Sequence, residues 1–135
     1  MKQHQKITTF LMFSGNAEEA MNFYCSTFDQ SEILTITRYG ANDVGKEGSV
    51  IHASFSLKGQ VFMAIDSSIK HEFTFTPAIS LYVTCDTDEE INYYYERLSN
   101  GGTVLMPLGA YPFSEKYGWI QDKYGVSWQL SLEKP

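Results

Sequence analysis

The chain has 135 residues, of which 43% are apolar and 15% aromatic, a size that suits one compact domain and not two with separate cores. Ten basic residues against sixteen acidic ones give a formal net charge of −6. We expect no nucleic-acid partner, because such partners require a basic surface. The apolar runs are too short to span a bilayer, so we also expect no membrane partner and a cytoplasmic location.

The cysteine and aromatic contents narrow the possibilities further. Cys25 and Cys85 are the only cysteines and form no C-x-x-C motif, which favours two buried, reduced thiols over a disulfide or a cysteine zinc site. Nine Tyr, nine Phe and two Trp exceed what the packing of so small a domain requires. We expect the surplus rings to line a cavity or to lie at a subunit interface.

The first half of the chain predicts a strand, a helix and three more strands. A strand is expected over 7–13. Asn16, followed three residues later by Glu19, is typical of an N-cap with a capping box, and apolar residues at helical spacing follow it. Further strands are expected over 31–39, 49–57 and 61–66, the last two joined by a hairpin turn at 58–60.

The second half repeats this order. A strand over 77–84 precedes a helix that begins at Thr87 with Glu90 in its capping box and ends at the Asn100-Gly101-Gly102 stop signal. The segment 107–114 is typical of a proline-punctuated loop. The remaining strands are expected over 103–106, 116–121 and 126–132.

The two halves also align with each other. A shift of 71 residues places Glu18-Glu19 on Glu89-Glu90, and a shift of 66 places Gly59 on Gly125. The shared element order indicates two βαβββ modules, about 1–70 and 71–135, in a single domain. The predicted fold class is therefore α+β, with the two sheets pairing around a concave face.

Several motifs in this framework resemble a known family. They are FSGNAEEA at 13–20 with FY at 23–24, HA at 52–53, MAID at 63–66 and WIQDKYGVSWQL at 119–130. The chain resembles the vicinal oxygen chelate superfamily of glyoxalases, bleomycin-resistance proteins and extradiol dioxygenases, and most closely its PhnB-like branch. The resemblance implies paired βαβββ modules, a homodimer and a cavity in each cupped sheet.

Relatives in this branch are often labelled 3-demethylubiquinone-9 3-methyltransferase-like, but the residues give that activity no support. A methyltransferase of the Rossmann type needs a glycine-rich turn between a strand and a helix. The only glycine pair, Gly101-Gly102, follows a helix instead.

The resemblance also implies where a metal would bind. Metal-dependent members hold their ligands in the first and last strands of each module, which correspond here to Thr9 and Ser80, and to Met63 and Gln129. The self-alignment pairs these positions in the same way. Only Gln129 is a passable ligand, and a transition metal needs about three good donors. We therefore predict no metal and no cofactor, and a ligand-binding cavity at these positions.

His52 and Asp66 are the catalytic candidates. Strand alternation places His52 with Val50, Ser54 and Ser56 on one face, where it could act as a general base or hydrogen-bond donor oriented by Asp66. Alternatively, His52 is a structural strand histidine, and Asp66 stabilises the start of the loop that follows it.

These residues lead to a preferred function and two alternatives. The preferred one is a protein that binds a small organic molecule in a cavity walled by Tyr111, Phe113 and Trp119. A divergent metal-dependent lyase or dioxygenase would instead use His52, Asp66 and Gln129. A third possibility is an interaction protein that keeps only the fold.

Overall fold

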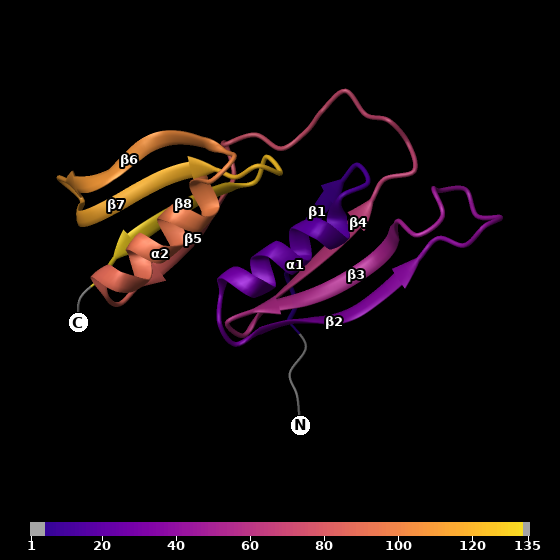
Figure 1. The fold of residues 1–135 in the computed structure, drawn as a ribbon, viewed down its shortest axis with the longest axis horizontal. Helices are drawn as coiled ribbons and strands as arrows, with labels where there is room; N and C mark the ends of the chain where they lie inside the picture. Colours follow the sequence, from indigo (N-terminus) through magenta and orange to yellow (C-terminus); the bar gives the residue numbers. More distant parts are fainter. Residues whose placement is uncertain (1–4, 134–135) are drawn as a thin grey trace. The chain divides into compact units, whose positions relative to one another are not determined.

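The computed structural model describes residues 5–133, and the chain divides into two compact units, Met1–His71 and Glu72–Pro135. The first unit contains one four-stranded sheet with the strand order β1-β4-β3-β2 (Figure 1). Strands β1 and β4 run parallel, and the other neighbours are antiparallel. Its elements are β1 (Thr9–Phe13), α1 (Ala17–Thr27), β2 (Ser31–Arg38), β3 (Val50–Leu57) and β4 (Gln60–Asp66).

The second unit repeats this topology. Its sheet has the order β5-β8-β7-β6, again with one parallel pair, β5 and β8. The predicted α+β class with two βαβββ modules is confirmed. Its elements are β5 (Ser80–Cys85), α2 (Asp88–Ser99), β6 (Thr103–Tyr111), β7 (Ser114–Gln121) and β8 (Ser127–Leu132).

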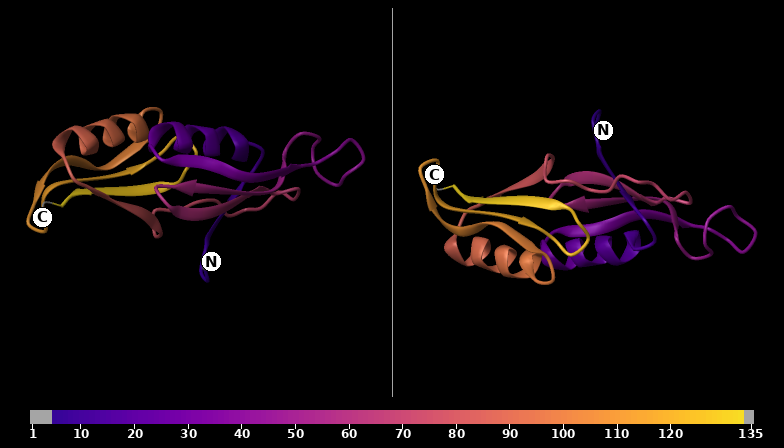
Figure 2. Two further views of the ribbon diagram at one scale, coloured as in Figure 1. Left: turned by 90° about the horizontal axis from the view of Figure 1, so that it is seen from below. Right: turned by 90° about the horizontal axis from the view of Figure 1, so that it is seen from above.

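Each helix covers one face of its own sheet (Figure 2). In the first unit, Tyr24 of α1 stacks on Phe55, and Phe55 stacks on Phe62, with ring centroids 6.4 and 5.4 Å apart. In the second, α2 buries Ile91 and Leu98, and the strand β8 buries the apolar side chains of Trp128, Leu130 and Leu132 at alternate positions. We call the opposite side of each sheet its far face.

The start of α1 differs from the sequence prediction. Asn16 occupies the N-cap position, but its side chain makes no capping hydrogen bond. The Asp66 carboxylate replaces it, because its Oδ1 accepts from the backbone N–H groups of Gly15 and Ala17 at 2.8 and 2.9 Å. The predicted cap of α2 is confirmed, since Thr87 Oγ1 accepts from the Glu90 backbone N–H at 3.1 Å.

The predicted loop over 107–114 is wrong. Strand β6 continues through Pro107 to Tyr111, and β7 begins at Ser114. Proline lacks a backbone N–H and is tolerated only where a sheet does not need one. Strand β6 lies at the sheet edge and has register shifts on both sides of Gly109, which is how this edge accommodates the proline.

Strand β3 also departs from simple alternation. Val50 is buried, whereas Ile51 is exposed, the reverse of what the alternation predicts. The pairing with β2 passes from His52 directly to Val50, so Ile51 is the extra residue of a bulge. One inserted residue reverses the faces of the positions before it.

Candidate functional site

Five uncharged side chains form a continuous hydrogen-bonded chain on the far face of the second sheet. The Tyr117 hydroxyl donates to Gln129 Oε1, and Gln129 Nε2 donates to Ser80 Oγ at 3.2 Å. Ser80 Oγ and Ser127 Oγ lie 2.7 Å apart, and Trp119 Nε1 donates to Ser127 Oγ at 2.8 Å. We call this set the polar chain.

The pairing of the strands explains this arrangement. In β8, Ser127 and Gln129 alternate with Trp128 and Leu130, and the latter two are buried. Ser80 pairs directly with Ser127 in the parallel neighbour, and Trp119 pairs with Gln129 in the antiparallel one. The polar members therefore gather on the side away from α2.

An aromatic cluster adjoins one end of the polar chain. The Tyr117 ring packs edge-on against Tyr111 and Phe113, with centroid distances of 5.6 and 4.8 Å. Tyr111 and Phe113 stack on each other at 5.7 Å, and the Tyr111 hydroxyl donates to the Pro107 carbonyl at 2.7 Å. Tyr117 thus belongs to both the aromatic cluster and the polar chain.

Burial raises the pKa of Tyr117 above its ordinary value, with smaller contributions from Tyr82 and Tyr111. A phenol is protonated at neutral pH even at its ordinary pKa of about 10, and the raised pKa of Tyr117 extends the alkaline range over which it stays a hydrogen-bond donor. Tyr82 pairs with Gln129 across the sheet, which places another ring beside the polar chain.

The structure brings together five of the residues singled out from sequence: Ser80, Tyr111, Phe113, Trp119 and Gln129. Sequence reasoning missed Tyr117 and Ser127. The signal that could have found them is strand alternation, because Tyr117 and Ser127 lie two positions away from Trp119 and Gln129 in the same strands.

The other candidates belong to the first unit. His52 and Met63 lie on its far face, and the Phe10 ring lies 6.3 Å from the His52 ring. Thr9 points the other way, because it pairs with Phe62, which stacks on Phe55 under α1. In the structure, Thr8 and Phe10 therefore correspond to Ser80 and Tyr82. The sequence alignment of the two halves, which paired Thr9 with Ser80, is shifted by one residue in this strand.

The Asp66 carboxylate accepts hydrogen bonds from the backbone of the first unit. It is 3% exposed, and besides capping α1 it accepts from the Val50 backbone N–H at 2.9 Å. Residues 64 and 66 share the helix-covered face, opposite His52. The structure therefore contradicts the hypothesis that Asp66 orients His52.

The residues at the family's metal positions do not suit a transition metal. They provide hydroxyls, one amide and one thioether, whereas such ions prefer imidazole, thiolate and carboxylate. Within residues 5–133, no group of three or more His, Cys, Asp or Glu side chains is placed to hold a metal ion. The absence of a bound metal stays a prediction.

A family model described as 3-demethylubiquinone-9 3-methyltransferase matches residues 5–131. The chain belongs to this family. A solved structure of the PhnB protein from Bacillus cereus is 67% identical to this chain and has a TM-score of 0.94. The match covers 96% of this chain and 100% of the Bacillus cereus chain. Protein YjdN from Escherichia coli is 21% identical over 142 residues, covering 95% of each chain.

More distant structures place this PhnB-like family in the vicinal oxygen chelate fold. One is FosX from Listeria monocytogenes, a fosfomycin resistance protein solved with Mn(II) and 1S,2S-dihydroxypropylphosphonic acid. It is 14% identical, covers 97% of this chain and 93% of its own, and has a TM-score of 0.62. This likeness concerns the fold alone.

Neither helix of residues 5–133 is long and apolar enough to cross a membrane.

Proposed function

We propose that this PhnB-like protein binds a small organic molecule on the far face of its second sheet, without a tightly held metal. The observation that carries the proposal is the polar chain joined through Tyr117 to the aromatic cluster. Binding sites for small molecules combine apolar and aromatic walls with a few placed polar groups. Whether His52, Met63 and Thr9 of the first unit take part stays a prediction.

We do not extend the methyltransferase activity in the family's description to this chain. The connection from β1 to α1 contains one glycine, Gly15, and the pair Gly101-Gly102 lies between α2 and β6. Nucleotide-type methyl donors are held where a glycine-rich turn joins a strand to a helix. The proposed function therefore includes no cofactor.

A fragment screen followed by ¹⁵N-correlation NMR tests where ligands bind. We expect bound fragments to shift the Trp119 indole N–H signal, which is assigned with Trp119→Phe, and the amides of β7 and β8. Gln129→Leu should weaken the binding of the best fragment about tenfold by removing the centre of the polar chain. Gln121→Leu is the matched control, because that amide donates to the Gly125 carbonyl instead. Fragments that shift no far-face signal would overturn the proposal.

Elemental analysis tests the metal part of the proposal. Protein purified without chelators should contain far less than one transition-metal ion per chain. Stoichiometric metal that is lost in His52→Ala would favour the divergent metal-dependent lyase or dioxygenase instead.

We also propose that the protein is a cytoplasmic homodimer. Support for a dimer comes from large apolar side chains that stay exposed on the first unit, Phe10 and Leu34 among them. Light scattering coupled to size exclusion should give twice the chain mass of 15.3 kDa, and a mass of one chain would contradict the dimer.

A further inference from the structure

We infer that the molecule bound on the far face of the second sheet is an uncharged aromatic compound that presents an acceptor oxygen, such as a ketone. This inference rests on the proposed function and adds the ligand class. It follows from the hydrogens that the polar chain leaves unused, from the charges around the polar chain and from the exposed rings beside it.

The polar chain has more donor hydrogens than it uses. Its side chains carry six: two on Gln129 Nε2 and one each on Tyr117, Ser80, Ser127 and Trp119. Their four mutual hydrogen bonds consume four. One amide hydrogen and one serine hydroxyl hydrogen therefore remain. The number of unused hydrogens does not depend on which serine donates. If the Gln129 amide were turned the other way, two hydrogens would still remain, the second of them on the Tyr117 hydroxyl instead of on a serine.

The acceptor oxygens of the polar chain need a ligand partner less than its unused donor hydrogens do. Gln129 Oε1, Ser80 Oγ and Ser127 Oγ each accept at least one hydrogen bond within the polar chain. An oxygen that keeps one unused lone pair costs less than an N–H or O–H without an acceptor. A ligand that covers this face and excludes water is therefore required above all to accept hydrogen bonds.

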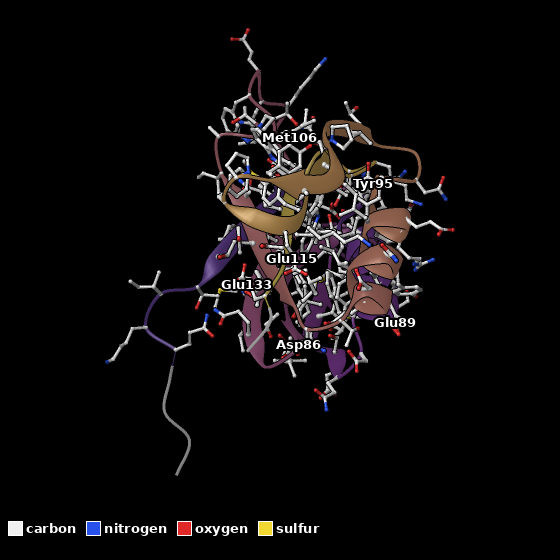
Figure 3. The ribbon with its side chains drawn as sticks, turned by 90° about the vertical axis from the view of Figure 1, so that its left-hand side faces the viewer. Asp86, Glu89, Tyr95, Met106, Glu115 and Glu133 are labelled. Atoms are coloured by element: carbon white, nitrogen blue, oxygen red, sulfur yellow. The ribbon has the colours of Figure 1, made fainter. Side chains whose placement is uncertain are left out.

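The surrounding charge argues against an anionic ligand. The polar chain has no charged member, and the Ser131 hydroxyl, on the residue opposite Tyr117, donates to Glu133 Oε2 at 2.6 Å. Figure 3 views the second unit from the end at which Glu115 and Glu133 lie, with Glu89 on α2, the helix that covers the opposite face. A carboxylate ligand would meet the Glu133 carboxylate without a cation in the polar chain to offset the repulsion. An ammonium ligand would bring more donors to a face with surplus donors.

Rings on the same face favour an aromatic ligand. Phe113 is 63% exposed and Tyr82 is 57% exposed, although both adjoin the polar chain through Tyr117 and Gln129. A planar ligand would stack on or pack edge-on against these rings while its oxygen accepts from the unused hydrogens.

Four compounds that share one ring system test the inference by NMR titration: 1-indanone, indane, 1-aminoindane and 1-indanecarboxylate. We expect 1-indanone to bind about tenfold more tightly than indane and more tightly than either charged analogue, with shifts at the Trp119 indole and the amides of β7 and β8.

A single substitution tests the donor count directly. In Gln129→Glu both amide hydrogens disappear, and the carboxylate can accept from Tyr117 and Ser80, so that every remaining donor has a partner. The preference for 1-indanone over indane should vanish, and 1-aminoindane should become the tightest of the four. Gln121→Glu is the control that makes the same change outside the polar chain, and it should keep the preference for the ketone.

The outcomes separate the two proposals. Binding at the far face with equal affinity for 1-indanone and indane, or tightest binding of a charged analogue by the unmodified protein, would overturn the ligand class and leave the proposed function in place. A ketone preference that survives Gln129→Glu would also overturn it. If none of the four compounds shifts a far-face signal, the ligand class fails, and the proposed function fails with it only when the fragment screen also finds no far-face ligand.

Discussion

Asp66 joins three parts of the first unit through one carboxylate. Its two oxygens accept from the backbone N–H groups of Gly15, Ala17 and Val50. The Ala17 and Val50 donors would otherwise be buried without acceptors, which is costly. The acidic side chain at the end of β4 therefore stabilises the architecture of the unit, and this role is sufficient to account for it without catalysis.

Asp66→Ala should reduce the free energy of unfolding by roughly 3 kcal/mol, because it leaves three backbone donors without their acceptor. Urea denaturation followed by circular dichroism measures this change. Asn16→Ala, at the N-cap of the same helix, should cost less than about 0.5 kcal/mol, because its side chain makes no capping bond. Equal losses for the two variants would show that Asp66 is not the cap.

Tyr117 should make stability depend on alkaline pH. Burial raises its pKa, so the folded protein holds this proton more tightly than the unfolded chain does. The resulting stability is complete below the ordinary tyrosine pKa of about 10 and is lost as the pH rises through the folded pKa. Tyr117→Phe should therefore flatten the decline of the urea midpoint above about pH 10. Tyr93→Phe, a change at an exposed tyrosine, is the control and should leave the decline as it is.

At the scale of elements, both helices and all eight strands follow from hydrophobic periodicity and turn residues. Periodicity could not reveal the bulge at Ile51 or the passage of β6 through Pro107, since both depend on which neighbouring strand is present to accept the irregularity. The polar chain was only partly predictable for the same reason. Alternation within one strand places Gln129 on a face, but the meeting of Ser80 with Ser127 depends on the register between two strands.

The connection between α2 and β6 requires glycine at position 102. A Cβ atom there would lie 2.2 Å from the Gln121 carbonyl oxygen and 3.0 Å from the Asp122 backbone, and backbone atoms cannot move aside cheaply. Gly102→Ala should cost about 2 kcal/mol of unfolding free energy, measured by urea denaturation. Gly109→Ala is the matched control in β6, since a Cβ at that position meets no atom within 4 Å. A similar loss in both variants would contradict the steric explanation.

At the scale of the whole molecule, the repeat of element order was enough to predict two βαβββ modules. Sequence identity between the halves is low, but each half repeats the topology that buries one helix against one sheet. Function was less accessible, because the family's fold supports many activities and only particular side chains decide among them.

The segment between β4 and β5 should be the first site of proteolysis. It lies outside both sheets, and within it Phe73 is 64% exposed, which suits cleavage by chymotrypsin. Limited digestion followed by mass spectrometry should find the first cut after Phe73, giving fragments that correspond to the two units. A first cut inside a strand would contradict this prediction.

The different caps of the two helices have a consequence for folding order. The cap of α2 joins Thr87 and Glu90, which are three positions apart. The cap of α1 is Asp66, which lies 49 positions from Ala17 and 51 positions from Gly15. The first turn of α2 can therefore be completed within its own segment, before any strand has paired. The first turn of α1 must wait until nearly the whole unit has closed on itself, at the entropic cost of a long loop. Although the units share one topology, we expect the second to start from its helix and the first to form helix and sheet in a single step.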